Sequence, residues 1–568
     1  MKAGTSRSHF PAGSTVIAGL LLVLLPIPAI RGLQNQKGSI QGVVLRGNTE
    51  APAVGVHVDV IAGAGDFYQK PVQTTTTDGS GKFKLLGLTP GVYSLRFSRE
   101  GYTDSFLGER HTNRGFFVRI VNVDSGQTAS DIVMRLAPTG SVNGTVRDVR
   151  GQPVAGVPVG LSRSVFGDDG TKTIQSAGAT TTDDRGEYRI YGVESGQYFV
   201  FAGGNRQRVI KGNESVEPFA LSYYPGVDDI AHGDAIELKP GGNISGIDFT
   251  LRVPRVYRIR GRIIDAATNM PPASPGMATS TGIMSQPQHS YDPKTGNFEI
   301  SGLAPGDFKV SAWIRGSPCG APLSIDEIFT TNAAGIPSNA GAAGSTSVRL
   351  GEGDLDNVLV MIRHGGCLKG NVTTEGKPLP HWFALELRSN DQRELRTSIS
   401  MQNDGQFKVD GLLPGTYQLI PRRLPDGFYL KAAMIGGTDV LNTPLEFNAE
   451  ASKPMQILLS SKVAHAEGTV TDATGKPAAG VLVVLVPQDL RDRYDLYVTT
   501  DTDEGGKFIL DDLAPGNYWA FAWESMEENS WMNAEVIGRY RQYGQTVHLA
   551  EESKEVLSLR VVPLGPSK

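Results

Sequence analysis

Apolar and polar side chains alternate along the stretch GKFKLLGLTPGVYSLRF, which begins at Gly81. The apolar positions recur at every second residue in two short runs, and they are Phe83, Leu85, Tyr93, Leu95 and Phe97. A period of two places these side chains on one face of two strands. Between the runs lies Pro90-Gly91, a pair typical of tight turns. The pattern therefore predicts two strands joined by a Pro-Gly turn.

The same unit returns four more times along the chain. Its aromatic anchors stand 105, 110, 109 and 101 residues apart, and they are Phe83, Tyr188, Phe298, Phe407 and Phe508. Near-constant spacing predicts tandem domains, and a repeat of about 105 residues is long enough to bury its own core. The predicted divisions are a leader at 1–32, repeat 1 at 33–137, repeat 2 at 138–254, repeat 3 at 255–364, repeat 4 at 365–462 and repeat 5 at 463–568.

The fold class predicted from this pattern is all-β. Beyond about the first thirty residues no long apolar pattern with the helical period appears, and each repeat offers about seven strands, as in a small β-sandwich. Repeat 3 is the least regular, and its Gly/Ala/Ser-rich segment 332–347 is predicted to be a flexible loop. Five sandwiches end to end would reach about 170 Å. A bent or folded-back arrangement is equally open.

The N-terminus has a different character. Lys2 and Arg7 precede an apolar run at 16–25, and Pro26 and Pro28 follow. A basic start, a short apolar run and helix-breaking prolines predict a secretory signal peptide over 1–32. The run is short for a membrane span, which needs about 20 apolar residues. Retention as an uncleaved anchor is the alternative.

Composition narrows the choice of partners. The formal net charge is −5, and the 54 basic residues are scattered along the chain, which argues against a nucleic-acid surface.

Two cysteines, Cys319 and Cys367, follow the leader. Export permits a disulfide between them, and closing a loop of about 48 residues would contribute about 3–4 kcal/mol. Two separate buried thiols are the alternative, because no spacing pattern demands a bridge.

Two motifs together carry a family resemblance. The first is GTVTDATGKPAAGVLVVLV from Gly468, and the second is the pattern TDxxGxFxxxxLxPGxY, which includes the anchor of each repeat. They resemble the carboxypeptidase regulatory-like domain, a transthyretin-like (Ig-like, prealbumin-type) β-sandwich of the carbohydrate-binding-like fold group. The match is strongest in repeats 1, 2 and 5. The resemblance implies a non-catalytic accessory module, of a kind found in large exported bacterial proteins.

The family's name makes a test for zinc peptidase residues necessary. Only His548 and Glu551 form an HxxE pair, and no further histidine follows them. The chain also has no HExxH, no GxSxG elbow and no phosphate-binding loop. We therefore expect no catalytic residues, no cofactor and no enzymatic activity. A pair of hydrolytic carboxylates needs no motif, so a hydrolase with an unrecognised site is the second alternative.

Acidic residues cluster in one turn of repeat 5. Asp501, Asp503 and Glu504 precede Gly505-Gly506 and are weak candidates for a Ca²⁺ site, which needs six to eight oxygen ligands. The alternative is that the aspartate caps the turn with its own side chain. Each repeat has Asp or Asn at this place, which favours capping.

Repeat 5 also carries the candidate binding residues. In NYWAFAWES, Tyr518 belongs to the core face, so alternation turns Trp519, Phe521 and Trp523 to the other face. With Trp531 nearby, they could stack against sugar rings as an exposed platform. The alternative is that a long loop or the adjacent domain covers them.

The leading prediction is an exported, non-enzymatic scaffold or interaction protein. A carbohydrate-binding accessory protein of the cell envelope that uses the aromatic platform is the first alternative. The expected partner is an envelope or extracellular protein or a glycan, with no nucleic acid, and with a membrane only through an uncleaved signal anchor. We expect a monomer in the periplasm, at the cell surface or secreted.

Overall fold

A computed structural model provides the structure of this protein. It describes residues 36–563 apart from 48, 64–68, 113–114, 205–209, 212–213, 216–218, 254, 281–287, 321–335, 337–339, 381–382, 392–395, 400, 402–403, 450–452, 490–491 and 504. The predicted signal peptide lies outside the described residues. Strands dominate, as predicted, and the one α-helix of the described residues is α1 (Ala534–Tyr540). No helix in the described part has both the length and the apolar character needed to cross a membrane.

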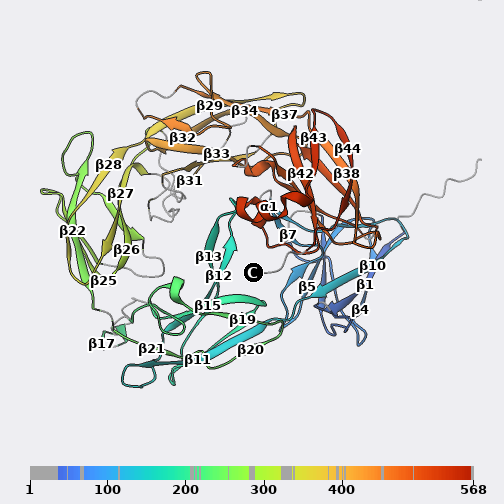
Figure 1. Ribbon diagram of the computed structural model, residues 1–568, viewed down its shortest axis with the longest axis horizontal. Helices are drawn as coiled ribbons and strands as arrows, with labels where there is room; N and C mark the ends of the chain where they lie inside the picture. Colours follow the sequence, from blue (N-terminus) through green and yellow to red (C-terminus); the bar gives the residue numbers. More distant parts are fainter. Residues whose placement is uncertain are drawn as a thin grey trace, which may run out of the picture.

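The repeats follow one another around a ring (Figure 1). Repeat 5, in red, returns to lie beside repeat 1, in blue. A cleft lined by Met134 of repeat 1 and Tyr497 of repeat 5 marks the place where the two meet. The folded-back arrangement is therefore the one the chain adopts, and the straight string is not.

Repeat 1 encloses its core between a three-stranded sheet, β10-β1-β4, and a second sheet, β3-β2-β5-β6, in which β9 also pairs with β5. The strands β7 and β8 form a separate two-stranded sheet. The strands are β1 (Gly38–Arg46), β2 (His57–Ala62), β3 (Gln73–Thr76), β4 (Lys82–Leu88), β5 (Gly91–Ser98), β6 (Ser105–Phe106), β7 (Arg110–Thr112), β8 (Gly115–Phe117), β9 (Val121–Val123) and β10 (Thr128–Leu136).

Repeat 2 has the same two-sheet plan, with β14-β11-β20 and β13-β12-β15-β18. The strand β21 also pairs with β11, and β19 pairs with β15. Its elements are β11 (Gly140–Asp148), β12 (Pro158–Phe166), β13 (Lys172–Thr181), β14 (Glu187–Val193), β15 (Gly196–Ala202), β16 (Ile210–Lys211), β17 (Glu214–Ser215), β18 (Ser222–Tyr223), η1 (Ile230–His232), β19 (Ala235–Leu238), β20 (Asn243–Ile244) and β21 (Phe249–Leu251).

Repeat 3 joins its strands in the order β23-β26-β27-β28-β22-β25-β24, but its two halves are connected only where Ala342 and Ala343 of β27 pair with His364 and Arg363 of β28, and they enclose one core between them. The strands are β22 (Tyr257–Asp265), β23 (Gly276–Ser280), β24 (Gln288–Tyr291), β25 (Asn297–Leu303), β26 (Gly306–Arg315), β27 (Ala340–Leu350) and β28 (Leu355–His364).

The prediction of a flexible loop at 332–347 is wrong where the structure describes it. From Ala340 onward this segment belongs to β27, which pairs along the length of β26. The backbone of β27 passes close to that of β28 here. A Cβ on Gly344 would lie 1.9 Å from the carbonyl oxygen of Met361. Glycine is therefore needed at this position because two backbones nearly touch, and the composition of the segment does not indicate mobility.

Repeats 4 and 5 return to two sheets each. Repeat 4 has β32-β29-β37-β34-β35 and β31-β30-β33-β36, and repeat 5 has β41-β38-β44 and β40-β39-β42-β43. Repeat 4 contains β29 (Gly366–Glu375), β30 (Ala384–Ser389), β31 (Arg396–Ile399), β32 (Gln406–Leu412), β33 (Gly415–Arg423), β34 (Tyr429–Ile435), β35 (Thr438–Asp439), β36 (Leu445–Phe447) and β37 (Met455–Ser460). Repeat 5 contains β38 (Ala464–Thr471), β39 (Leu482–Pro487), η3 (Tyr494–Leu496), β40 (Val498–Asp501), β41 (Lys507–Leu513), β42 (Gly516–Trp523), η4 (Ser530–Met532), α1, η5 (Arg541–Tyr543), β43 (Gln545–Leu549) and β44 (Lys554–Arg560).

The first strand of every repeat has the same surroundings. It lies between the hairpin strand, which is antiparallel to it, and a strand from the end of the repeat, which is parallel to it. In repeat 1 these neighbours of β1 are β4 and β10. Because the first strand of a repeat pairs with a strand near its end, the beginning and the end of each repeat lie in the same sheet.

A glycine in each first strand permits this pairing. A Cβ on Gly261 would lie 1.8 Å from the carbonyl oxygen of Val358 and 2.8 Å from the ring of Phe298. The same close approach to a neighbouring carbonyl occurs at Gly42, Gly144, Gly370 and Gly468. In repeats 1, 3, 4 and 5 the ring of the aromatic anchor lies against this glycine, and in repeat 2 Tyr188 is the cross-strand partner of Gly144.

The tyrosine of the PGxY motif also has a structural role. Its hydroxyl donates to the carbonyl oxygen four residues earlier, and the pairs are Tyr93 with Thr89 at 2.7 Å, Tyr198 with Glu194 at 2.9 Å, Tyr417 with Leu413 at 2.8 Å and Tyr518 with Ala514 at 2.8 Å. This bond closes the turn between the hairpin strands. Repeat 3 has Phe308 at the equivalent place, which has no hydroxyl to donate.

Replacing the first-strand glycine should therefore damage a repeat. We expect Gly261→Ala to lower the free energy of unfolding by about 1–3 kcal/mol, because the added methyl group overpacks a backbone contact. The measurement is chemical denaturation of the full chain. The matched control is Gly353→Ala in the same repeat, where a Cβ meets nothing within 4 Å. An effect of equal size in both variants would contradict the proposed role of the close contact.

Candidate functional site

The predicted aromatic platform is not on the surface. Trp519 is 8% exposed, Phe521 is 1% exposed and Trp523 is fully buried. Trp531 is 4% exposed and belongs to the same cluster. The alternation was predicted correctly, since Tyr518 packs into the sandwich core and these three side chains face the opposite way. The predicted exposure was wrong, so these residues offer no platform for a sugar.

The connection between β42 and β43 provides the cover. Its elements η4 and α1 fold over the outer face of β42 and form a second core there. Trp523 stacks on Phe521 with ring centroids 4.8 Å apart and meets the edge of Tyr540 at 5.7 Å. Arg541 lies over the ring of Trp519 at 4.9 Å, as a cation–π contact. These aromatic side chains are therefore packed internally, which is the alternative that the sequence left open.

The acidic turn of repeat 5 is built as a capped turn. One carboxylate oxygen of Asp503 accepts from the backbone N–H groups of Gly505 and Lys507, both at 2.8 Å. Asp78 and Asp183 accept in the same way in repeats 1 and 2. Asp501 lies on β40, and Glu504 lies outside the described residues. Within the described part, no group of three or more His, Cys, Asp or Glu residues is arranged to hold a metal ion.

The residues of the HxxE pair have separate surroundings. Nδ1 of His548 lies 2.8 Å from the side-chain oxygen of Asn517. Glu551 forms an ion pair with Lys431 of repeat 4 at 2.6 Å. Glu551 therefore belongs to the contact between repeats 4 and 5.

The hairpin formed by β12 and β13 is the most unusual feature of the ring. Its strands have nine and ten residues, and its turn is at 167–171. Figure 1 shows the hairpin extending from repeat 2 into the middle of the ring, toward α1 and toward repeat 4. We call residues 166–171 the hairpin tip. It contacts two repeats that are distant from it in sequence.

The first contact is with three arginines of repeat 4. Arg388 binds Asp169 at 2.9 Å and Asp168 at 3.3 Å. Arg422 also pairs with Asp168, and Arg396 lies 3.4 Å from it. A carboxylate of repeat 4, Glu386, completes the cluster with a two-bond pairing to Arg422 at 2.9 Å for both bonds. Three cations and three carboxylates balance in this contact, which we call the charged junction.

The charged junction is buried at Arg388 and Asp169 and open to water at its rim, where Asp168 is 32% and Arg396 is 42% exposed. The Arg388 side chain is only 5% exposed. Burial by itself raises the pKa of Asp168, but the hydrogen bond from Arg422 and the charges of the three arginines outweigh it and lower that pKa. The pKa of Asp169 is likewise lowered against the effect of burial, by hydrogen bonds from Thr171 and by Arg388. Both carboxylates are therefore charged at neutral pH, as a buried pairing with arginine requires.

The second contact is with repeat 5. The side-chain amide of Asn533 donates to the carbonyl oxygen of Gly170 at 2.9 Å. The oxygen of the same amide caps α1, accepting from the N–H groups of Glu535 and Val536 at 3.1 Å. Gly170 has a φ of +66°, and a Cβ there would lie 2.6 Å from the carbonyl carbon of Met532. Only glycine fits this position, both for its backbone angle and for the space available.

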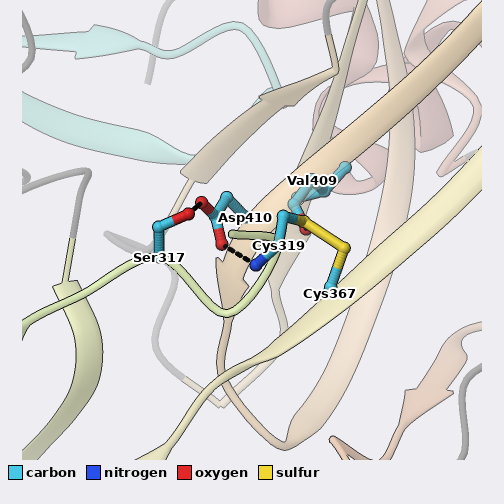
Figure 2. Close-up of a disulfide and its surroundings, with 5 residues drawn as sticks. All are labelled: Ser317, Cys319, Cys367, Val409 and Asp410. Atoms are coloured by element: carbon cyan, nitrogen blue, oxygen red, sulfur yellow. Dashed lines mark hydrogen bonds between the residues drawn. A yellow bond between two sulfur atoms is a disulfide. The ribbon is translucent and has the colours of Figure 1, made fainter. Parts of the chain in front are cut away.

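A disulfide joins repeats 3 and 4. Cys319 and Cys367 are bonded, with Cα atoms 5.0 Å apart. Figure 2 shows the loop of Cys319 beside strand β32, where the backbone N–H of Cys319 donates to Asp410 at 2.8 Å and Ser317 binds the other oxygen of Asp410. A small apolar cluster of Ile336, Ala340 and Ala343 contacts Leu413 beside it. The disulfide that the sequence permitted is therefore present, and it links repeat 3 to repeat 4.

Comparison with known families agrees with the motifs. The model of the carboxypeptidase regulatory-like domain matches residues 39–135 and 466–526. The chain contains carboxypeptidase regulatory-like domains. They lie at two positions, in repeats 1 and 5, which are the two ends that meet in the ring. No curated protein matches the chain.

Solved structures with similarity to this chain are multi-domain β proteins of bacteria. The Bacillus anthracis TIE protein has 11% identity and a TM-score of 0.15, over 74% of each chain. The minor pilin GBS52 of Streptococcus agalactiae has 17% identity and a TM-score of 0.20, over 38% of this chain and 98% of its own. BcpA, the major pilin subunit of Bacillus cereus, has 13% identity and a TM-score of 0.14, over 57% of this chain and 99% of its own.

Little in the sequence indicates the charged junction. The segment FGDDGTKT at 166–173 is indistinguishable from an ordinary Asp-Gly turn. Arg388, Arg396 and Arg422 are more than 200 residues away and follow no spacing pattern with it. The strands on both sides of this turn, with nine and ten residues, are longer than β2 and β3 of repeat 1, with six and four, but no pattern in the sequence marks that length.

The fit of Gly170 can be tested by substitution. We expect Gly170→Ala to release the hairpin tip, because the methyl group would clash with the backbone at Met532. Amide hydrogen exchange at residues 166–171 should increase at least tenfold. The matched control is Gly156→Ala in the same repeat, which has a similar φ of +72° but nothing within 4 Å of the added atom. Equal exchange at the tip in the two variants would mean that backbone strain alone is responsible.

The charged junction should also depend on pH. Because the folded-state pKa of Asp168 is lowered, its contribution to stability is complete above its unfolded value of about 4 and disappears as the pH falls through the folded value. We expect Asp168→Asn to be destabilised by about 1–2 kcal/mol at pH 7, because three arginines would lose a half-buried partner and water screens part of the loss. The deficit should shrink below about pH 4. The control is Asp184→Asn, an exposed turn residue of the same repeat. A deficit that persists unchanged at pH 3 would contradict the ionic role.

Proposed function

We propose that this protein is an exported, non-enzymatic scaffold or interaction protein made of five β-sandwich domains of the transthyretin-like type. The observation that carries the proposal is the closure of the ring by contacts between repeats that are not neighbours. The hairpin tip of repeat 2 binds repeats 4 and 5, and a disulfide fixes repeat 3 to repeat 4. Such a chain presents its outer surfaces in a fixed geometry, which is what a scaffold requires.

The roles found for chemistry-bearing residues support a structural function. Asp503 caps a turn, Glu551 pairs with a lysine of the preceding repeat, and the tryptophans of repeat 5 fill a core. The aromatic anchors and the PGxY tyrosines close hairpins. Each motif that recurs in the sequence is thus accounted for by folding.

Export is supported by two observations of different kinds. The basic and apolar pattern at 1–32 is typical of a signal peptide. The Cys319–Cys367 disulfide belongs in an oxidising compartment, because thiols in the cytosol are kept reduced. We propose the periplasm, the cell surface or the extracellular space as the location, with an envelope or extracellular macromolecule as partner.

Small-angle X-ray scattering tests the closed scaffold. We expect a radius of gyration below about 35 Å, between the ~24 Å of a compact domain of this length and the ~50 Å of a straight string of about 170 Å. Gly170→Ala should increase the radius, whereas Gly156→Ala should not. A wild-type value near ~50 Å would rule out the ring.

A separate measurement tests the proposal that the protein has no enzymatic activity. The same preparation should release no product above background from panels of peptide and glycoside substrates. Turnover that survives further purification, and that follows the protein through two columns, would instead favour a hydrolase with an unrecognised site.

A further inference from the structure

One thiol of the disulfide and one carboxylate are cross-strand neighbours in repeat 4. Cys367 lies on β29, and Asp410 lies on β32, which runs antiparallel to β29 and pairs with it. The pairing shifts by one residue between Gly366 and Leu368, which is the geometry of a β-bulge. Cys367 therefore lies opposite the pair Asp410-Gly411.

Repeat 5 shows what this arrangement does to the two side chains. His465 and Asp511 occupy the equivalent places on β38 and β41, beside the same irregularity of pairing. They form an ion pair. The bulge thus brings the outward side chains of the two strands into contact. In repeat 4 the same geometry holds a thiol-bearing residue and a carboxylate side by side, so the fold of that repeat alone positions both.

The other cysteine comes from repeat 3, and Asp410 holds the loop that carries it (Figure 2). The backbone N–H of Cys319 donates to one carboxylate oxygen at 2.8 Å, and the hydroxyl of Ser317 donates to the other. Sγ of Cys319 also lies 3.6 Å from the carbonyl oxygen of Val409. A disulfide sulfur has no proton to donate, whereas a thiol at this place would donate one to that carbonyl. The contacts that hold the loop therefore do not require the disulfide.

Other contacts close the joint between repeats 3 and 4 beside the bridge. The backbone N–H of Gly365 donates to the carbonyl oxygen of Gly341 at 2.9 Å. Ile336 and Ala340 of repeat 3 pack near Leu413 of repeat 4. The two repeats thus meet through hydrogen bonds and apolar contacts that are independent of the state of the cysteines.

We propose that Asp410 is the positioning residue for the disulfide. It docks the Cys319 loop on repeat 4 while both cysteines are still thiols, and the bridge then closes between groups that are already neighbours. Holding two reacting groups together raises the effective concentration of one at the other. The proposal concerns how the chain matures, and it does not depend on the proposed scaffold function.

The closing reaction is thiol–disulfide exchange with an oxidant that itself carries a disulfide. One protein thiolate attacks the oxidant, breaks its S–S bond, forms a mixed disulfide and releases one oxidant thiolate. The second protein thiolate attacks the mixed disulfide, forms the Cys319–Cys367 bond and releases the other oxidant thiolate. Two electrons pass from the protein to the oxidant, and the two protons of the protein thiols end on the released thiols. The compartment that receives the chain must supply such an oxidant.

The equilibrium between the bridged and reduced forms measures the effective concentration. The full mature chain is equilibrated with mixtures of reduced and oxidised glutathione, free thiols are alkylated, and the bridged fraction is measured by mass spectrometry. We expect Asp410→Ala to lower the equilibrium constant for bridge formation at least tenfold. Asp410→Asn should cause a smaller loss, because the amide oxygen still accepts from the Cys319 N–H. The matched control is Asp511→Ala, at the same place in repeat 5, which should change the constant less than twofold.

Docking in the reduced state has a separate measurement. In the Cys367→Ser chain, which cannot form the bridge, hydrogen exchange at the Cys319 amide should stay within threefold of that in the bridged wild type. Adding Asp410→Ala should accelerate this exchange at least tenfold, while amides of β30 in the same repeat keep their protection. A general loss of stability would instead accelerate exchange in β30 as well.

Three results would overturn the proposal. They are an equal equilibrium constant in Asp410→Ala and the wild type, an equal fall in Asp410→Ala and Asp511→Ala, or an unprotected Cys319 amide in the Cys367→Ser chain. The third measurement decides alone if Asp410→Ala fails to fold, because that chain retains Asp410. A chain that scatters as a compact ring yet leaves the reduced loop undocked would refute this proposal and leave the scaffold proposal intact.

Discussion

The ring depends on the pairing of two acidic residues at the hairpin tip. Asp168 and Asp169 lose part of their contact with water when the tip enters the middle of the ring, and this loss is unfavourable unless each charge is paired. Arg388, Arg396 and Arg422 meet them from repeat 4, and Asn533 of repeat 5 holds the backbone of the same turn. One short turn thereby joins three repeats. Its contacts are directional, which fixes the relative positions of those repeats more strictly than apolar packing would.

Within each repeat, a second constraint acts at the level of single atoms. The first strand can pair on both sides only where a glycine admits a neighbouring carbonyl, and an aromatic ring covers the gap. This contact persists in repeats 2, 3 and 4, which the family model does not match, as well as in repeats 1 and 5, which it does. The same core geometry therefore also occurs in repeats that the family model does not match. Folding, and not ligand binding, explains the recurring motif.

The interior of the ring and its outer edges have different characters. Around the charged junction, arginines and carboxylates of two repeats are paired and partly buried, and at the Cys319–Cys367 bridge two repeats are covalently joined. At the closure between repeats 1 and 5, in contrast, edge strands and exposed aliphatic side chains border a cleft.

The local structure of this protein could be predicted from its sequence. Alternation located the strands, the Asp-Gly and Pro-Gly pairs located the turns, and the spacing of Phe83, Tyr188 and their equivalents revealed the repeats, because these features depend on residues close together in the chain. Only the tertiary structure decided which faces are buried and which repeats touch. Trp519 and Trp523 alternate as predicted, yet a connection about twenty residues long covers them. Asp168 meets Arg388 across 220 residues. Such contacts follow from how whole repeats pack, and no local pattern encodes them.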